Sequence, residues 1–344
     1  MRVLVVKLSS LGDVVHTFPA VTDAVAAVPG IVIDWLVDES FAGLARLHPS
    51  VRQVIPLPIR RLKRAPRAAL ADMRAALARL RAERYDIVID AQGLMKSALA
   101  ARLARSVARH GFSRATAREG AAAWTYDVEH DIPEIEHMAM RIRRLFARAI
   151  GYAEPVTPAD AGLAPARFAV QQGGRARVVL IHGTTWPTKT WTVEGWRRLA
   201  ATADAAGFDA VLFAHGAREE ARVAAIAAGI DSVRRLPSGS IEDLVPVLAN
   251  AAGIVTVDTG LGHLAAALDR PVIGLYGPTD PGLTGLVGPR AREIVATLSC
   301  APCEKTRCAV RPDFGEGPPC LADRAPDVVF AALRALMAQD SPTD

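Results

Sequence analysis

Short, almost entirely apolar runs alternate with longer amphipathic runs along most of this chain, and this alternation constrains the fold more than any other feature. Runs of four to seven apolar residues are typical of parallel strands that are buried on both faces. We expect such strands at residues 3–6, 31–37, 87–90, 178–182, 210–213, 254–257 and 272–276. Helical patterns lie between or after them, at residues 14–28, 67–84, 95–107, 136–150, 194–206, 241–250, 262–268 and 326–337. This order predicts an α/β fold of doubly wound parallel sheets.

The alternation is interrupted once, near the middle of the chain. Residues 151–174 hold three prolines and four glycines and have no regular period, which is typical of an interdomain linker. A chain of 344 residues is long enough for about two domains. We therefore expect an N-terminal domain at residues 1–155, a linker at 156–174 and a second domain at 175–322. A C-terminal helix and tail at 323–344 could pack back on the first domain.

Composition and the N-terminus exclude several classes of protein. Apolar residues make up 51% of the chain and charged residues 22%, so intrinsic disorder is excluded as the dominant state. The longest uncharged stretch, residues 244–257, is shorter than the about 20 residues that a membrane-spanning helix needs. The first apolar run ends at once in Lys7, unlike a signal peptide. We expect a cytoplasmic protein without disulfide bonds.

The positive charge is concentrated in the first half of the chain. Residues 1–172 carry 24 Lys and Arg against 17 Asp and Glu, whereas residues 173–344 carry 17 against 19. Arginine accounts for 36 of the 41 basic residues, which points to a GC-rich genome rather than to a nucleic-acid partner. Residues 60–84 hold nine basic residues and only two acidic ones.

Two interpretations of residues 60–84 stay open, and they are compatible. An amphipathic helix packed on the core explains the apolar residues on one helical face. Docking on an anionic membrane surface explains the basic residues on the others. The basic residues that would dock are Arg60, Arg61, Lys63, Arg64 and Arg67.

The loop after the first expected strand, KLSSLGD at residues 7–13, ends in an aspartate at the start of a helix. Ligands of open α/β sheets bind beyond the carboxyl ends of the strands, so this loop is a candidate site. It lacks the G-x-G-x-x-G spacing, which argues against a dinucleotide cofactor and an oxidoreductase. The pattern alone favours Asp13 as a helix cap over a reactive carboxylate.

Three loops in the second half follow strands in the same way. HGTTWPTK at residues 182–189 brings hydroxyls and an ammonium together, which suits a phosphate, although a solvated loop explains it equally well. VDTGLGH at residues 257–263 places free N–H groups at a helix start, where an anion can bind. YGPTDPG at residues 276–282 is the third. Together they predict an anion site at one edge of a sheet.

Four cysteines lie within 21 residues near the C-terminus, namely Cys300, Cys303, Cys308 and Cys320. Four thiols at short spacing can bind zinc or another thiophilic metal. Their spacing is irregular compared with that of a zinc ribbon. Buried or free thiols are therefore the favoured interpretation, and a structural metal site is the alternative.

These loops together resemble the heptosyltransferases of glycosyltransferase family 9, which have the GT-B fold. The resemblance covers nearly the whole chain and rests on VLVVKLSSLGDVVHTFPAVTDA at residues 3–24, DAQGLMKSALAARLA at 90–104, TAREGAAAWTYD at 116–127 and VDTGLGHLAAALDRPVIGLYGPTDP at 257–281. DAQGLMKSA together with TAREG is similar to the members that place the first heptose on the inner Kdo residue of lipid A. The cysteine spacing is more common among members that add the second heptose.

The resemblance implies two Rossmann-like domains facing across a cleft, an inverting reaction with ADP-heptose, and no cofactor or catalytic metal. It implies that Asp13 is the general base, in a loop with Lys7, Ser9, Ser10 and Gly12. The implied donor-binding residues are Thr184, Thr185, Lys189, Glu219, Gly239, Asp258, Thr259, Gly260 and His263. Glu220 leaves the position of the ribose-binding acid uncertain by one residue. Gly239 stands where some relatives have a methionine under the adenine.

The implied partners are ADP-heptose, Kdo-lipid A and the anionic cytoplasmic face of the inner membrane, to which the protein would bind peripherally. Two other functions stay open. One is transfer of the second heptose, and the other is binding of a nucleotide sugar without catalysis. Asp13 argues against the second alternative, because a binding protein needs no base.

Overall fold

The computed structural model describes residues 1–170, 173–237, 239–315 and 317–339. The chain forms two compact units, Met1–Leu163 and Ala164–Asp344. Residues 171–172 of the expected linker and 340–344 of the expected tail lie outside the described residues. In the part of the chain that is described, no helix is both long enough and apolar enough to span a membrane.

The first unit is built on a parallel sheet. Its strands are β1 (Arg2–Val6), β2 (Val32–Asp38), β3 (Val51–Leu57), β4 (Arg84–Asp90), β5 (Arg105–Phe112) and β6 (Val128–His130), in the order β3-β2-β1-β4-β5-β6. The central strand β1 pairs in parallel with β2 and β4, so that Val3 lies opposite Ile33 and Ile87. Residues 3–6 are fully buried because helices cover both faces of the sheet, as the continuous apolar pattern predicts.

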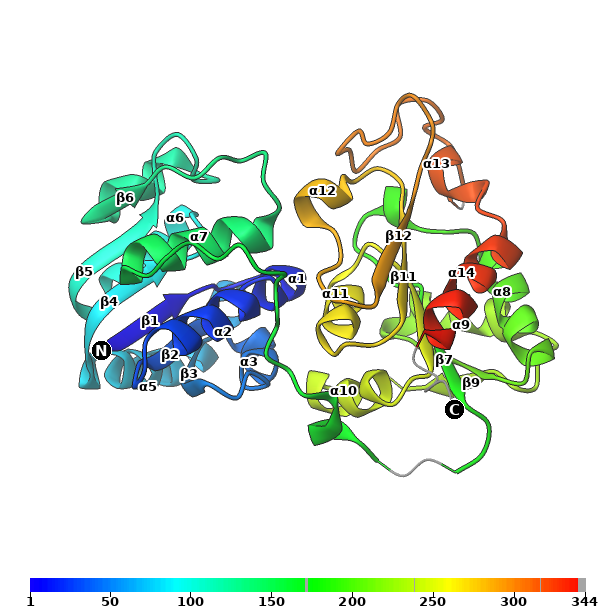
Figure 1. Ribbon diagram of the computed structural model, residues 1–344, viewed down its shortest axis with the longest axis horizontal. Helices are drawn as coiled ribbons and strands as arrows, with labels where there is room; N and C mark the ends of the chain where they lie inside the picture. Colours follow the sequence, from blue (N-terminus) through cyan, green and yellow to red (C-terminus); the bar gives the residue numbers. More distant parts are fainter. Residues whose placement is uncertain (171–172, 238, 316, 340–344) are drawn as a thin grey trace. The chain divides into compact units, whose positions relative to one another are not determined.

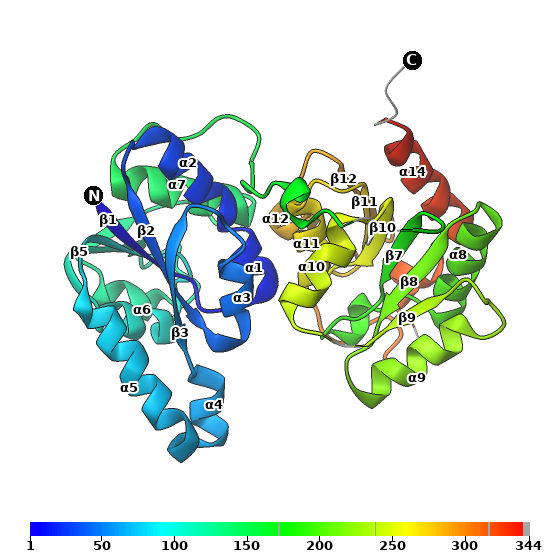
Figure 2. The same ribbon diagram turned by 90° about the horizontal axis from the view of Figure 1, so that it is seen from below.

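The helices of the first unit lie on both faces of its sheet. They are α1 (Leu11–Val15), α2 (Phe18–Ala27), α3 (Ala42–Ala45), α4 (Ile59–Arg64), α5 (Pro66–Ala82), α6 (Met95–Arg102) and α7 (Met138–Ile150). Figure 2 shows α2 and α7 on one face and α5 and α6 on the other. The fully buried Arg143 of α7 joins two of these helices through a bidentate pair with Asp23 of α2, at 2.6 and 3.1 Å.

The second unit repeats the architecture. Its strands are β7 (Arg177–Ile181), β8 (Asp209–Phe213), β9 (Arg234–Leu236), β10 (Gly253–Val257), β11 (Val272–Tyr276) and β12 (Ala291–Val295), in the order β12-β11-β10-β7-β8-β9. Its helices are α8 (Val193–Ala205), α9 (Gly216–Ala227), α10 (Ile241–Ala249), α11 (Gly260–Ala267), α12 (Pro281–Thr284), α13 (Pro319–Ala322) and α14 (Pro326–Ala338). The short helical turns of the chain are Glu39–Phe41, Gly120–Thr125, Pro165–Phe168 and Pro187–Lys189.

The last helix, α14, packs within the second unit. It contacts α8, β10 and β11 on the face of the sheet opposite α10 and α11 (Figure 1). Its buried Leu333 joins a core that includes Trp191 and Trp196, whose rings meet edge to face at 5.0 Å.

Both sheets have the same strand order, which is 3-2-1-4-5-6 when the strands are numbered within each unit. This is the order of the Rossmann fold, and it confirms the predicted doubly wound α/β class. The order reverses between β1 and β4 in the first unit and between β7 and β10 in the second. Ligands of such sheets bind beyond the carboxyl ends of the strands at this switch point.

Two helix predictions were wrong in part. The helix expected at residues 14–28 is divided into α1 and α2, and Pro19 stands in the first turn of the second helix, where its missing N–H costs no hydrogen bond. The helix expected at residues 95–107 ends at Arg102, and residues 105–107 belong to β5. Val107 of β5 is exposed, so its apolar side chain does not mark the buried face of a helix.

The packing of α14 predicts a difference between two truncations in this helix. Leu333→Ala should lower the free energy of unfolding of the second unit by about 2–5 kcal/mol, because it leaves a cavity in a core that excludes solvent. Val328→Ala in the same helix is the control, since Val328 is exposed and its loss should cost less than about 0.5 kcal/mol. Urea unfolding measures both, and equal midpoints would contradict the described packing.

Candidate functional site

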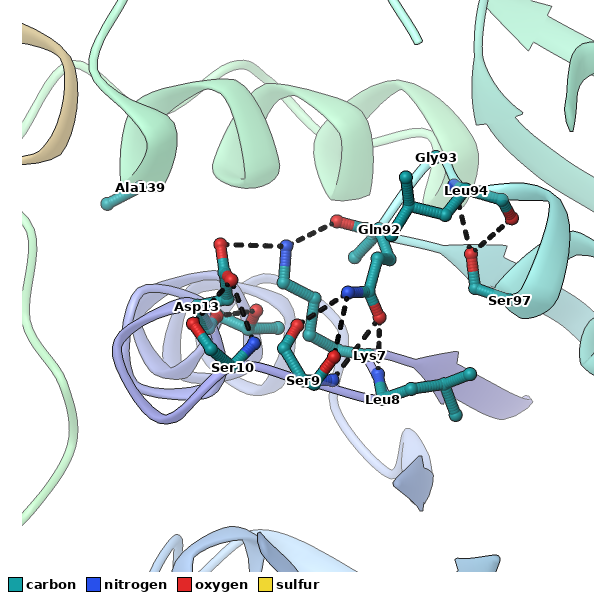
Figure 3. A network of polar contacts seen from close by, with 12 residues as sticks. Lys7, Leu8, Ser9, Ser10, Asp13, Gln92, Gly93, Leu94, Ser97 and Ala139 are labelled. Carbon is teal, nitrogen blue, oxygen red and sulfur yellow. Dashed lines mark hydrogen bonds and ion pairs between the residues drawn. The ribbon is translucent and has the colours of Figure 1, made fainter. Parts of the chain in front are cut away.

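The loops after β1 and β4 meet at the switch point of the first unit, and a buried lysine joins them (Figure 3). Lys7 is only 2% exposed. Its Nζ donates to the backbone oxygen of Ala91 at 2.8 Å and lies 3.8 Å from Oδ1 of Asp13. Burial lowers the pKa of Lys7, and the carboxylates of Asp13 and Asp90 oppose this effect.

Asp13 caps α1 with one of its two carboxylate oxygens. Oδ2 accepts hydrogen bonds from the backbone N–H and the hydroxyl of Ser10, both at 2.8 Å. Burial raises the pKa of Asp13, but Lys7 and the bonds from Ser10 lower it by more, so the pKa lies below that of a free aspartate. The aspartate is therefore a helix cap, as the pattern indicates, and also an ionised group whose Oδ1 points towards Lys7 (Figure 3).

Gln92 is a residue of this site that the sequence prediction missed. Its Oε1 accepts from the backbone N–H groups of Leu8 at 2.7 Å and Ser9 at 3.3 Å, and its Nε2 donates to the backbone oxygen of Ser9 at 2.6 Å. The side-chain amide thus binds the backbone of the loop that leads to Asp13. Lys96 adds a further contact to the same loop, through its Nζ to Oγ of Ser9 at 3.1 Å.

Asp90, at the end of β4, holds the loop that carries Gln92. Its fully buried carboxylate accepts from the backbone N–H groups of Gln92 and Gly93, from the hydroxyl of Ser97 at 2.8 Å and from that of Tyr126 at 2.7 Å. Burial raises the pKa of Asp90 although these bonds oppose it. An aspartate as the last residue of an apolar strand is the sequence signal that could have identified this group.

The second unit has a corresponding pair of charges at its switch point. Nζ of Lys189 lies 2.6 Å from Oδ2 of Asp258 and 4.3 Å from the centre of the Trp186 ring. Thr279 donates its hydroxyl to the same Oδ2 at 2.7 Å, and Nε2 of His263 lies 3.6 Å from Oδ1. Burial raises the pKa of Asp258, but His263 and Lys189 lower it by more, so its pKa lies well below the ordinary value.

Of the other expected donor residues, Thr184, Thr259 and Gly260 lie at the start of α11. The hydroxyl of Thr184 donates to the backbone oxygen of Asp258 at 3.3 Å, whereas Thr185 is exposed. Thr259 is the N-cap of α11, and Gly260 is its first residue. A Cβ at Gly262 would lie 2.7 Å from the side chain of Thr256, so only glycine lets the helix approach β10 this closely.

Glu219 lies in the first turn of α9, which follows β8, and Gly239 lies in the loop that follows β9. Oε2 of Glu219 accepts from the backbone N–H of His215 at 2.8 Å, and a Cβ at Gly183 would lie 2.8 Å from its Oε1. Glu219 therefore faces the loop after β7, whereas Glu220 is exposed. A Cβ at Gly239 would meet the side chain of Asp243, which caps α10.

Residues 60–84, the basic segment, lie mostly in helices α4 and α5, and their basic side chains differ in what they contact. Arg61 bonds to Glu39 and to Asp72, each at 2.7 Å. Arg60 lies over the ring of Phe41 and 4.0 Å from Asp38. Three further basic residues, Lys63, Arg64 and Arg67, are exposed. Figure 2 shows that α4 and α5 follow each other at the end of β3.

The apolar side of α5 packs on the core of the first unit, as the interpretation of residues 60–84 as an amphipathic helix expects. Leu80 is fully buried and Met73 and Leu77 pack against the same core, but Leu70 is 44% exposed. The apolar stripe is therefore shorter than the sequence pattern indicates.

The four cysteines are free thiols that line one cavity of about 130 Å³, together with Thr188 and Pro278. Burial, and then the other three thiols, raise the pKa of Cys320 to about 11, so this group is a thiol at neutral pH. Among the described residues, no three His, Cys, Asp or Glu side chains are arranged to hold a metal ion.

Comparison with known proteins identifies relatives along most of the chain. The model of "Glycosyltransferase family 9 (heptosyltransferase)" matches residues 73–312. Lipopolysaccharide heptosyltransferase 1 of Escherichia coli K12 is 46% identical over 84% of this chain and 91% of the relative. The structure described as "E. coli heptosyltransferase WaaC with ADP" has a TM-score of 0.86 and 39% identity, over 98% of this chain and 100% of the other. Lipopolysaccharide heptosyltransferase 2 of E. coli K12 is 26% identical over 99% of both chains.

The contacts of Asp13 predict how its pKa responds to loss of a neighbouring charge. Lys7→Met should raise the pKa of Asp13, because the buried cation that stabilises the carboxylate is lost while the burial remains. Lys96→Met is the control, since Lys96 contacts Ser9 and not Asp13. Carbon-13 NMR titration of the Asp13 carboxyl group measures both. An unchanged pKa in Lys7→Met would mean that the bonds from Ser10 and the charge of His16, and not Lys7, keep Asp13 ionised.

Proposed function

The chain belongs to glycosyltransferase family 9, and we propose that it transfers L-glycero-D-manno-heptose from ADP-heptose to the inner Kdo residue of Kdo-lipid A, with inversion at the anomeric carbon. It is a glycosyltransferase of lipopolysaccharide core biosynthesis. The observation that carries the proposal is that the two switch points hold different charge pairs. The pair in the first unit suits a base, and the pair in the second suits a diphosphate.

We assign the donor to the second unit. The ammonium of Lys189, the hydroxyls of Thr184 and Thr185 and the N-terminus of α11 would bind the diphosphate, because each presents positive charge or a hydrogen-bond donor. These groups also stabilise the negative charge that ADP gathers as the bond from its phosphate to the anomeric carbon breaks. The other donor contacts come from Glu219 to the ribose, from the Gly239 backbone to the adenine, and from Asp258, Thr259, Gly260 and His263.

We assign the acceptor and the base to the first unit. Asp13 would take the proton of the attacking Kdo hydroxyl at Oδ1, because Oδ2 is occupied by the two bonds from Ser10. Such assistance contributes about 10²–10⁴-fold to a rate. Lys7, Ser9, Ser10 and Gly12 form the loop that orients this carboxylate.

The surroundings of Asp13 also suit an acidic sugar. Kdo carries a carboxylate, and cationic side chains lie around this loop. Lys96 contacts Ser9, and the charges of Arg118 and Arg141 act on Lys7. An anionic acceptor is therefore attracted to the same loop that carries the base.

We further propose that the protein is cytoplasmic and binds peripherally to the inner membrane. Basic residues near an anionic lipid surface contribute about 1 kcal/mol each. Lys63, Arg64 and Arg67 are exposed and would contact lipid A phosphates or phospholipid head groups. Arg60 and Arg61 lie in the same segment, and their acidic neighbours hold them in defined positions.

A transfer assay with two acceptors tests the proposed function. The parent protein should add one heptose to Kdo-lipid A, detected by mass, and should not extend the monoheptosylated form. Preference for the monoheptosylated acceptor would identify the second-heptose activity instead. Binding of ADP-heptose without turnover of either acceptor would identify a non-catalytic protein. Activity should persist in EDTA, and loss that Mg²⁺ restores would contradict the metal-free reaction.

Asp13→Asn separates the base from the helix cap. The amide oxygen can still accept the bonds from Ser10 but cannot take a proton, so kcat should fall by about 10² or more while ADP affinity stays unchanged. Asp243→Asn is a matched control, because Asp243 accepts the same two bonds from Ser240 at 2.8 Å at the start of α10. Equal kcat values for both variants would mean that Asp13 caps α1 and is not the base.

Charge reversal tests the membrane surface. Replacing Lys63, Arg64 and Arg67 with glutamate should reduce co-sedimentation with vesicles of anionic phospholipid, and the difference should shrink at high salt. The control reverses Arg292, Arg307 and Arg311, which are exposed residues of the second unit and give the same change in net charge. Equal loss in both variants would mean that net charge, and not this segment, governs binding.

A further inference from the structure

One oxygen of Asp258 is shared by two donors, and one of them is not a residue of the proposed donor site. Oδ2 lies 2.6 Å from Nζ of Lys189 and accepts the hydroxyl of Thr279 at 2.7 Å. Thr279 is 3% exposed and Asp258 is 7% exposed, so water has little access to replace this bond. The other oxygen faces His263 at 3.6 Å.

The loop that carries Thr279 is hydrogen-bonded to residues 303–304, which lie between the first and last of the four cysteines. The backbone oxygen of Pro278 accepts from the N–H groups of Cys303 and Glu304 at 2.9 and 2.8 Å. The side chain of Glu304 in turn accepts from the N–H of Asp280 at 2.7 Å. These bonds fix the backbone on both sides of Thr279, so its hydroxyl has a defined position relative to Asp258.

The same segment also holds the turn that carries Lys189. The buried hydroxyl of Thr188 donates to the backbone oxygen of Lys305 at 2.7 Å. Residues 303–305 therefore join the loop after β11 to the turn after β7. Lys189 and Thr279 reach Asp258 from these two loops.

We propose that Thr279 is a positioning residue of the donor site: its hydroxyl orients the Asp258 carboxylate, and the carboxylate directs the ammonium of Lys189 towards the donor diphosphate. This inference rests on the proposed function. A lysine ammonium is a point charge on a flexible stem, so its position depends on its partners. The Trp186 ring and Asp258 are the partners of Lys189, and Thr279 fixes the orientation of Asp258.

Three variants of threonine residues test the role of the hydroxyl. Thr279→Val keeps the shape of the side chain but removes the donor, and it should weaken ADP binding and raise the KM for ADP-heptose by about tenfold. Thr279→Ser keeps the donor and should stay within about twofold of the parent. Thr202→Val is the matched control, because Thr202 also lies near an aspartate, at 3.4 Å from Asp327, but on α8. Calorimetry with ADP gives the affinities.

A double-mutant cycle distinguishes positioning of Lys189 from a general loss of structure. In a Lys189→Ala background, Thr279→Val should have no further effect on ADP affinity, because the group through which it acts is gone. Independent effects that add in the double variant would overturn the proposal. So would a Thr279→Val protein that binds ADP as the parent does.

The outcome for Lys189→Ala alone separates this inference from the proposed function. If it leaves ADP affinity unchanged, the proposed donor site itself is wrong. If it weakens ADP binding but Thr279→Val does not, only the role of Thr279 is wrong. Thermal unfolding checks each variant, and Thr279→Ala, which removes the hydroxyl without adding a methyl group, replaces Thr279→Val if that protein does not fold.

Discussion

Parallel strand pairing around a point where the strand order reverses is the constraint on which both candidate sites depend. It sends the loops after the two central strands to opposite faces of the sheet, so the backbone of these loops has no neighbouring strand to pair with beyond the strand ends. Side chains bind this backbone instead. Gln92 binds the backbone of Leu8 and Ser9 in the first unit, and Thr184 binds that of Asp258 in the second. The residues that complete the fold at these edges thus lie in the two candidate sites.

Each switch point holds a lysine beside an aspartate, but the two pairs differ in how completely the carboxylate is bound. Asp258 meets Lys189 and Thr279 on one oxygen and His263 near the other, which leaves little capacity to accept a proton. Asp13 has two short bonds on Oδ2, whereas Lys7 is 3.8 Å from Oδ1. The same arrangement of strands therefore leaves Oδ1 of Asp13 available for the proposed base, whereas it holds Asp258 as the counter-ion of Lys189.

The sequence predicted the central strands well and the outer strands poorly. β1, β7, β8, β10 and β11 are almost continuously apolar because both of their faces are covered, and β2 and β4 each contain an apolar run of three residues, Trp35–Val37 and Ile87–Ile89. β5 and β12 carry charged residues at exposed positions, so their pattern is weaker than that of a buried strand. Among site residues, those directly after strands were predictable. Gln92 and Thr279 were not, because their contacts join loops separated by 83–84 and 21 residues.

The position of Glu219 is an example of a feature that depends on packing and that the sequence pattern does not predict. Glu219 and Glu220 are adjacent and of the same residue type, so the sequence gives no reason to choose one of them as the ribose-binding acid. The distinction comes from Gly183, 36 residues earlier, where the absence of a Cβ leaves room for the Glu219 carboxylate. Replacement of Gly183 by any other residue would place an atom 2.8 Å from that oxygen.

The charge pair of the second unit explains why Asp258 needs more than one partner. Before a diphosphate binds, the ammonium of Lys189 balances the Asp258 carboxylate at 2.6 Å. When a diphosphate shares that ammonium, the carboxylate faces additional negative charge in a site where only 7% of the aspartate is exposed. Interactions between charges are stronger where water is excluded, so a carboxylate with no other donor would be repelled. In the donor site that we propose, the hydroxyl of Thr279 and His263 would lower this cost, and they would allow Lys189 to bind a diphosphate without losing the group that positions it.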